Sequence, residues 1–261
     1  MKNFALIIYR YLVAFWVDLI HLLYWLKNLP RYIYTYCKLK KEKGANKFGK
    51  IHLSYPCLHD KDDNAWVCKW HYFHQDLLVA SEIYKENPEK HVDIASRIDW
   101  FVAHLATFRE VEVLDIREID SKVKNIKFKQ ADLMDIWDDM KNYSSSISCL
   151  HAIEHFWLWR YWDSIDINGH LKWLDNIYKM LMRGGILYFS TPIGKQRIEF
   201  NAHRVFSIKY LYDYFIDKYE IEKFAYVDDN GDLHEDIDIK QGLKDTFWLT
   251  YGCGIFKLRK K

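Results

Sequence analysis

The sequence contains no internal repeat, no low-complexity tract and no tandem glycine pair other than Gly184-Gly185, so nothing in it indicates a repeat architecture. Cysteine is sparse: five residues are scattered along the chain, odd in number and without a CxxC spacing. That pattern argues against a disulfide framework and a cysteine-based zinc site, and it predicts a protein of the reducing cytoplasm without a metal ion. An excess of one charge is also absent, because 38 Lys and Arg face 36 Asp and Glu, and the net charge of +2 predicts no nucleic-acid partner.

The chain is instead rich in apolar and aromatic residues. With 261 residues and 50% hydrophobic content, it is long enough for one large α/β domain with extensions, and no second domain is required. Aromatic residues make up 17% of the chain, with 11 Trp and 19 Tyr. They fill a bulky core or line a cleft in which sugars stack, and the composition favours the core over the cleft.

The most apolar stretch runs from Phe4 to Trp25. Arg10 and Asp18 interrupt it, and each would cost roughly 2.5 to 3.5 kcal/mol at the centre of a bilayer, so we expect that it does not span a membrane. No small-residue cleavage site follows, so it is not a secretory signal. At 100° per residue the polar side chains gather on one narrow face, which leaves a broad apolar surface to be buried: Asn3, Arg10, His21 and Asn28.

A basic run follows the apolar stretch. It consists of Arg31, Lys38, Lys40, Lys41 and Lys43. Anionic lipid headgroups attract such charges at about 1 kcal/mol each, so one interpretation places residues 1–43 on a membrane surface at the inner face of the cell membrane. The other, equally open, is a helical arm that packs on the domain or on a second subunit of a homo-oligomer. Residues 1–48 are thus predicted to form an apolar helical arm and basic linker, and residues 49–261 the main domain.

The main domain opens with a predicted helix from His71 to Asn87, stopped by Pro88. We expect Phe73, Leu77, Ala80 and Tyr84 on its inner side. A short strand from His91 to Ile94 follows, then a tight turn and a helix whose apolar residues repeat at helical spacing: Phe101, Val102 and Leu105.

Further strands alternate with helices and predict a parallel, doubly wound sheet. They are Val111 to Leu114, Ile126 to Lys129, Ser145 to Leu150, Ile186 to Thr191, Ile221 to Tyr226 and Phe247 to Phe256. Ser207 is the expected N-cap of the helix before the strand at Ile221, and Asp229 to Gly231 form a turn.

In such a sheet ligands lie beyond the carboxyl ends of the strands. Asp93 ends the first strand and Asp115 the second, about one βαβ unit later. A carboxylate at the tip of the second strand accepts hydrogen bonds from the hydroxyls of a ribose, which indicates a nucleotide-like ligand.

Several segments together resemble the successive motifs of the class I S-adenosylmethionine-dependent methyltransferases. They are Asp93-Ile94-Ala95-Ser96-Arg97, Asp115-Ile116, Gln130 to Leu133, Ser148 to His155 and Leu181 to Tyr188. The sequence is similar in particular to an uncharacterised branch associated with bacterial surface-polysaccharide genes, through HYFHQDL (71–77), ASR (95–97), SCLHAIEHF (148–156) and the PIG and EFNAHRVFS segments (192–207). The resemblance covers about residues 55 to 225.

The resemblance implies a Rossmann-like methyltransferase fold with an antiparallel last strand, and S-adenosylmethionine as cofactor. The implied cofactor-binding residues are Asp93, Ala95, Ser96 and Arg97 for the methionine portion, Asp115 for the ribose, Asp132 and Leu133 for the adenine, Leu150 beside the methyl group, and Ile116 next to Asp115. Tyr72, His74 and Gln75 are expected to cover the cleft and contact the substrate.

Methyl transfer to a hydroxyl needs a base beside the cleft. The candidates are His203, which we favour, and His151, Glu154 and His155. Each has a purely structural alternative, as a satisfied histidine or a capping carboxylate. Arg204 is a candidate ligand for a phosphate or carboxylate on the acceptor, or a surface ion-pair partner. The branch's gene association, with the aromatic content, predicts O-methylation of a sugar or sugar-derived acceptor for a bacterial surface glycan.

Two other functions stay open. Ala95, Arg97 and Trp100 stand where glycines are common in the superfamily, which suggests a methyltransferase-like module that has lost its ligand and serves as a binding partner. His151, Glu154 and His155 also match the HxxEH pattern of zinc peptidases, but that pattern works only inside a helix, and here it begins on a predicted strand.

Overall fold

The computed structural model describes residues 5, 8–10, 12–13, 18–42, 51, 53, 58, 68, 70–118, 122–134, 136, 138–156, 158, 165–200 and 202–261. The chain divides into two compact units, residues 1–67 and 68–261. The domain boundary that the sequence predicts near Gly49 lies outside the described residues, as does Lys43 of the basic run.

The first unit contains helix α2 (Leu19–Lys41), whose N-cap Asp18 accepts a hydrogen bond from the His21 backbone at 2.9 Å. No residue of this helix is buried. Exposed apolar side chains occur around much of its circumference, and one row of them, at spacings of three and four, forms an apolar face: Leu22, Leu26, Leu29 and Ile33. Among the described residues, no helix combines the length and apolar character that crossing a membrane requires.

The second unit is built on an eight-stranded sheet with the order β3-β2-β1-β4-β5-β10-β8-β9. The strands are β1 (Val92–Ile94), β2 (Val111–Asp115), β3 (Ile126–Gln130), β4 (Ser144–Leu150), β5 (Leu181–Ile193), β8 (Tyr219–Val227), β9 (Leu233–His234) and β10 (Gly252–Lys260). Strands β1 to β5 pair in parallel, whereas β10 runs antiparallel to both β5 and β8. This arrangement confirms the predicted Rossmann-like methyltransferase fold and its antiparallel last strand.

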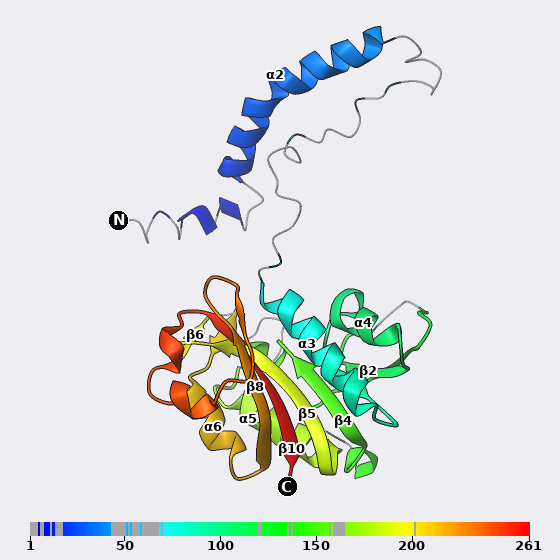
Figure 1. Ribbon diagram of the computed structural model, residues 1–261, viewed down its shortest axis with the longest axis vertical. Helices are drawn as coiled ribbons and strands as arrows, with labels where there is room; N and C mark the ends of the chain where they lie inside the picture. The colour runs from blue at the N-terminus through cyan, green and yellow to red at the C-terminus, as the bar shows by residue number, and fades with distance from the viewer. Residues whose placement is uncertain are drawn as a thin grey trace. The chain divides into compact units, whose positions relative to one another are not determined.

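Helices cover both faces of the sheet (Figure 1). They are α3 (His71–Glu86), α4 (Ala103–Ala106), α5 (Gly169–Met180) and α6 (Ile208–Phe215), with a distorted turn at Ile98–Val102 before α4. Side chains on alternate sides of the strands pack into two apolar clusters. One lies under α3 and α4 and includes Ile83 and Leu105; the other lies under α5 and α6 and includes Ile177 and Phe215. The Ser207 hydroxyl caps α6, as predicted.

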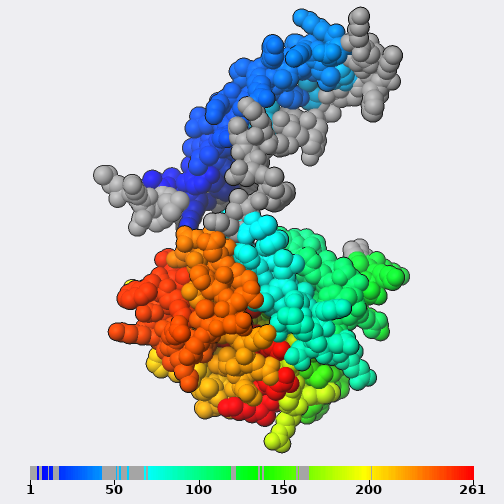
Figure 2. Space-filling view, in the orientation of Figure 1, coloured from blue at the N-terminus to red at the C-terminus, as the bar shows by residue number. Residues whose placement is uncertain are grey.

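The inner side of α3 differs from the prediction. Phe73, Leu77 and Tyr84 are 44%, 46% and 67% exposed, and of the four predicted residues only Ala80 is buried. The buried side instead carries Gln75, Asp76, Val79, Glu82 and Ile83. Figure 2 shows α3, in cyan, lying beside the orange segment around β8. The buried side has an apolar part, formed by Val79, Ala80 and Ile83. Gln75 and Glu82 are buried beside it because they have polar partners on the strands.

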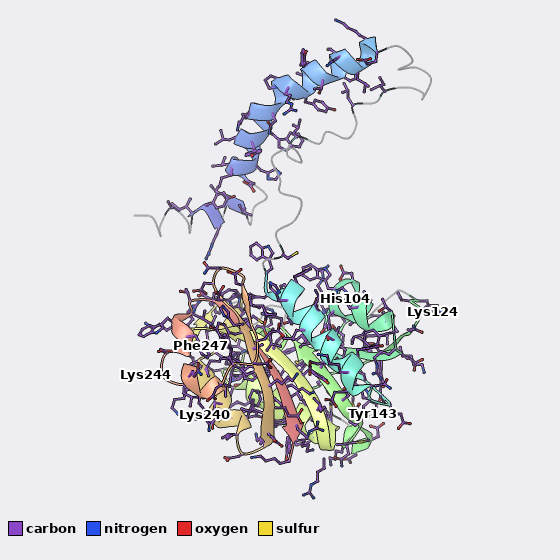
Figure 3. The ribbon with its side chains drawn as sticks, viewed as in Figure 1. His104, Lys124, Tyr143, Lys240, Lys244 and Phe247 are labelled. Atoms are coloured by element: carbon purple, nitrogen blue, oxygen red, sulfur yellow. The ribbon has the colours of Figure 1, made fainter. Side chains whose placement is uncertain are left out.

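The last strand also begins later than predicted. Thr246, Phe247 and Trp248 have φ values of 55°, 55° and 59°, so the backbone forms a left-handed turn there and β10 begins only at Gly252. The Phe247 ring stacks on Tyr226 of β8 at 4.6 Å between centroids, which holds the turn against the sheet. Phe247 lies in the same edge segment as Lys240 and Lys244 (Figure 3). Packing of this ring, rather than strand pairing, therefore decides the local structure.

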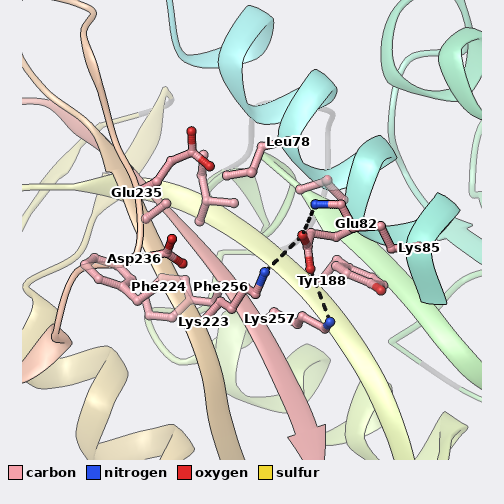
Figure 4. Close-up of a pocket in the computed structure, with 13 residues that line it drawn as sticks. Leu78, Glu82, Lys85, Tyr188, Lys223, Phe224, Glu235, Asp236, Phe256 and Lys257 are labelled. Atoms are coloured by element: carbon pink, nitrogen blue, oxygen red, sulfur yellow. Dashed lines mark hydrogen bonds and ion pairs between the residues drawn. The ribbon is translucent and has the colours of Figure 1, made fainter.

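Charged side chains of α3, β8 and β10 form a small ion network on one face of the sheet (Figure 4). Glu82 contacts Lys85 and Lys223 at 3.0 and 3.1 Å and Lys257 at 3.2 Å. The three lysines outweigh the burial of this carboxyl and lower its pKa to about 2. A cavity of about 150 Å³ lies beside the network. The arrangement joins the second half of α3 to β8 and β10 and so fixes the helix on this face of the sheet.

Candidate active site at the carboxyl ends of the strands

A cavity of about 810 Å³ lies at the carboxyl ends of β1, β2, β3 and β4, within the size range of small-molecule sites. The residues predicted from sequence that line it are Tyr72, Gln75, Ala95, Ser96, Arg97, Asp115, Ile116, Asp132, Leu133, Leu150, His151 and His155. Asp93, His74, Glu154, His203 and Arg204 are not among the residues that line it. Chain segments that follow four different strands are thus brought together, as the doubly wound topology requires.

Asp93 lies beneath the cavity and organises the first loop. Its carboxylate accepts hydrogen bonds from the Ser96 backbone and hydroxyl, at 3.1 and 2.9 Å, and from the Ser148 hydroxyl of β4 at 2.6 Å. Burial raises the pKa of Asp93 to about 7, against the lowering effect of these hydrogen bonds. Asp93 therefore shapes the loop that ends at Arg97.

Two residues that line the cavity have a left-handed backbone. Ala95, after β1, has φ 61°, and His151, after β4, has φ 48°. Residues other than glycine rarely adopt this region, and such strain is concentrated at functional sites. Ala95 thus takes up the backbone conformation that a glycine at this motif position would provide, although its side chain differs.

The second strand ends in a carboxylate that is already paired. Asp115 accepts hydrogen bonds from the Arg117 backbone at 2.8 Å and from its guanidinium at 3.0 and 2.7 Å. The neighbouring Ile116 is 57% exposed and offers an apolar surface to the cavity. Asp132 accepts a hydrogen bond from the Met134 backbone at 2.9 Å, which closes the loop after β3.

Helix α3 forms the wall opposite these loops. Asp76 is 4% exposed, and burial raises the pKa of its carboxyl to about 6. Gln75 donates a hydrogen bond to Asp76 at 2.9 Å and accepts one from the Ser190 hydroxyl of β5. The Tyr72 ring meets the edge of Trp100 with centroids 5.1 Å apart. His74 contacts the ring of Phe73 and does not line the cavity.

His151 and Glu154 form a buried pair at the end of β4. The Glu154 carboxylate binds His151 Nδ1 at 2.8 Å, and both side chains are almost fully buried. Burial lowers the pKa of His151, but nearby Cys253 and Glu154 outweigh it and raise the pKa above its usual range. Residues Ile153–His155 form a single 3-10 turn, so the HxxEH segment does not form the helix that a zinc peptidase needs.

His155 and His203 lie close together beside the cavity. His155 lines it, and the two ring centroids are 6.3 Å apart. His155 Nδ1 is 2.7 Å from the Ala202 carbonyl oxygen, which can only accept a hydrogen bond. Neutral His155 therefore carries its proton on Nδ1, and its Nε2 lies 3.7 Å from the Glu154 carboxylate. His203, on strand β7 (His203–Val205), pairs with β6 (Arg197–Glu199) and contacts the Tyr251 ring at 5.2 Å.

Arg204 is placed differently from the prediction. It is 3% exposed, and its guanidinium donates hydrogen bonds to the backbone carbonyls of Phe156, Asp166 and Ile167. It joins the segment after β4 to the chain before α5, so neither an acceptor phosphate nor a surface ion pair describes its contacts.

Several lining residues were missed from the sequence. Asp76, Arg117, Phe156 and Trp173 all line the cavity. Asp76 was hidden because an acidic residue one turn into a helix reads as a solvent-facing residue. Arg117 was detectable, because a basic residue two positions after the strand-end carboxylate is within reach of that carboxylate.

Comparisons with known proteins agree with the fold. A family model described as "Caenorhabditis protein of unknown function, DUF268" matches residues 103–220, which is less than half of the chain. No curated protein matches the sequence. The solved structure of the [4+2]-cyclase SpnF is similar with a TM-score of 0.51 and 11% identity, over 72% of this chain and 80% of that chain. The N-methyltransferase NodS from Bradyrhizobium japonicum, in complex with S-adenosyl-l-homocysteine, has a TM-score of 0.49 and 12% identity, over 87% of this chain and 98% of that chain. At such identities the likeness shows the fold alone.

Proposed function

We propose that the protein is an S-adenosylmethionine-dependent methyltransferase that O-methylates a sugar or sugar-derived acceptor. The observation that carries the proposal is the cavity of about 810 Å³ at the carboxyl ends of the strands, lined by most of the residues that the methyltransferase motifs single out. The glycan context rests on the sequence resemblance. The exposed aromatic rings of Tyr72 and Trp100 at the cavity offer surfaces against which a sugar ring stacks.

The residues present fit the cofactor. Asp115, although paired with Arg117, keeps acceptor capacity on Oδ2 for a ribose hydroxyl. Ile116 offers an exposed apolar surface to the adenine, and Ala95 keeps the backbone conformation of a glycine. Asp76, inside the cavity wall, offers a carboxylate to a cationic methionine portion. When bound, S-adenosylmethionine supplies a methyl group on a sulfonium, ready for in-line transfer.

His155 is the base that the geometry favours. It lines the cavity, its Nδ1 proton is held by the Ala202 carbonyl, and its Nε2 lies 3.7 Å from the Glu154 carboxylate, which would stabilise the imidazolium once Nε2 takes the proton of the acceptor hydroxyl. S-adenosylmethionine would supply the methyl group, and His155 would hold the proton that the acceptor oxygen gives up. His203, which the sequence favours, does not line the cavity, and its ring centroid is 6.3 Å from that of His155. We assign it to the side of the site on which the acceptor would bind.

The test is transfer of a labelled methyl group to a crude saccharide or nucleotide-sugar pool. General-base catalysis contributes roughly two to four decades, so His155→Ala is expected to lose 10²- to 10⁴-fold in rate at unchanged cofactor affinity. His203→Ala serves as the matched variant and is expected to lose less. Wild-type rates in His155→Ala would remove it from the mechanism, and labelling of protein or nucleic acid instead of saccharide would refute the acceptor class.

A second component of the proposal concerns α2. Its apolar face is exposed throughout the helix, and its last turn carries Lys38, Lys40 and Lys41. An apolar face beside a cluster of cations is the pattern of a helix that lies in the interface of an anionic membrane. Such an arm would hold the enzyme near lipid-linked saccharides at the inner face of the cell membrane, in keeping with the glycan acceptor.

A further inference from the structure

Three potential metal ligands from distant parts of the chain meet beside the cavity. They are His71 in the first turn of α3, His151 after β4 and Cys253 on β10. One ligand atom from each lies within 4.8 Å of the other two. The His71 and His151 rings are stacked, with centroids 5.6 Å apart and an interplanar angle of 12°.

The central ligand, His151, has a buried nitrogen without an assigned contact. Its side chain is 3% exposed, and in the part of the chain that the structure describes Nε2 has no nitrogen or oxygen partner and only the Cys253 thiol as a polar neighbour. A buried polar atom without such a partner loses its hydration and gains no hydrogen bond in return, so it needs an explanation. The group it faces includes Cys253, which is fully buried.

The other nitrogen of His151 is held as in known zinc sites. Glu154 binds Nδ1 at 2.8 Å, which keeps a proton there, so a metal ion that binds Nε2 has only the Nε2 proton to displace. Metal-binding histidines almost always donate their second N–H to such a carboxylate or a carbonyl. The carboxylate is therefore an outer partner that orients the imidazole.

We propose that His71, His151 and Cys253 bind a zinc ion. Two imidazoles and a thiolate are typical zinc donors, and three protein ligands leave a fourth position open, as in catalytic zinc sites. Zn–N and Zn–S bonds of about 2.0 and 2.3 Å put tetrahedral ligand atoms roughly 3.3 to 3.6 Å apart, so rotamer shifts of about 1 Å close the group around the ion. His151 also lines the cavity, so the ion lies one imidazole away from it.

The proposal goes beyond the methyltransferase function and does not depend on it. It also explains why the spacing of the cysteines gave no signal: the site takes a single cysteine, and its ligands lie about 80 and 100 residues apart in sequence, so no local motif marks it.

The test is the metal content of the purified full-length protein, measured by mass spectrometry, and the affinity of the chelator-treated protein for Zn²⁺. We expect about one zinc per chain. Cys253→Ser and His71→Ala are expected to lose at least about 100-fold in affinity, and Glu154→Gln about 10- to 100-fold as an outer partner. The matched controls are Cys149→Ser, another buried cysteine, and His74→Ala, one turn along α3; both should retain wild-type affinity.

Cobalt substitution gives a second readout. Co²⁺ bound by Cys253 should show a thiolate charge-transfer band in the near ultraviolet, which Cys253→Ser abolishes while circular dichroism confirms the fold. If Cys253→Ser does not fold, His71→Ala, at a half-buried position, carries the test. The proposal is overturned if wild-type protein takes up no zinc after reconstitution, or if the variants and controls bind it equally.

Discussion

At the scale of single residues, Ala95 and Asp93 control the first loop of the site. Ala95 turns the chain by adopting a left-handed conformation with φ 61°. Asp93 holds the turned loop through three hydrogen bonds from two serines. Both residues lower the stability of the folded protein: Ala95 through its left-handed backbone and Asp93 through the burial of its carboxylate. Each effect can be measured as a change in the free energy of unfolding.

Replacing Ala95 by glycine should remove backbone strain. The left-handed region costs an alanine about 1 to 2 kcal/mol, while glycine's extra freedom in the unfolded chain takes back about 0.4 to 1 kcal/mol. We therefore expect Ala95→Gly to leave the free energy of unfolding unchanged or raised by up to about 1 kcal/mol, in urea denaturation. Ala152→Gly, where φ is −117°, is the matched control and should lose at least about 0.5 kcal/mol. Equal losses in both variants would show that Ala95 is not strained.

Asp93 should make stability depend on pH. Its pKa rises from 3.8 to about 7 on folding, so the folded protein prefers the protonated form. Below about pH 4 Asp93 is protonated in both the folded and the unfolded protein, so its raised pKa costs no stability. Between about pH 4 and pH 7 the free energy of unfolding should fall by about 1.4 kcal/mol per pH unit. Asp93→Asn keeps the acceptor oxygen without the charge, so its stability relative to wild type should increase between pH 4 and pH 8. A constant difference across that range would contradict the assignment.

At the scale of elements, helix α3 of the second unit and helix α2 of the first differ in how many of their side chains are buried. Helix α3 buries polar residues because they meet partners on β5, β8 and β10: Gln75 meets Ser190, and Glu82 meets Lys223 and Lys257. Helix α2 buries nothing in the described structure, although it carries an apolar face. A cover for that face must come from outside the helix.

For α2 we expect binding to anionic lipid. Full-length protein should sediment with anionic liposomes and should lose this affinity at high salt, because screening weakens attraction to the lysines. Deletion of residues 1–43 should abolish sedimentation, and reversing the charge of Lys38, Lys40 and Lys41 should reduce it while leaving the helix intact. If liposomes capture neither form and the deletion makes the protein insoluble, the arm packs on protein instead.

At the scale of the whole molecule, sequence patterns were most informative about the sheet. Short β-prone runs separated by helices predicted that most strands are parallel. The acidic residues at strand ends indicated the edge of the sheet at which the cavity lies. Chain direction alone brings those residues together, so local patterns were sufficient. The predicted residues that line the cavity are almost all ones that directly follow a strand.

Long-range side-chain contacts could not be predicted. The polar inner side of α3 depends on partners more than 100 residues away, and the turn at Phe247 depends on stacking against Tyr226. Arg204 reads as a ligand in the sequence because its carbonyl partners carry no sequence signal. The cluster of His71, His151 and Cys253 likewise exists only in three dimensions. Such contacts decide which side chains are available for chemistry.

The central claim is that the cavity binds S-adenosylmethionine, and calorimetric titration of the full-length protein with this compound tests it most directly. We predict saturable binding at one site, weakened by one to two decades in Asp115→Ala, because a charged hydrogen-bond acceptor is typically worth about 1.5 to 3 kcal/mol. Arg117→Ala, which removes the partner of that carboxylate, should retain the affinity. A folded wild-type protein that gives no heat of binding, or an Asp115→Ala variant that binds as tightly as wild type, would contradict the account.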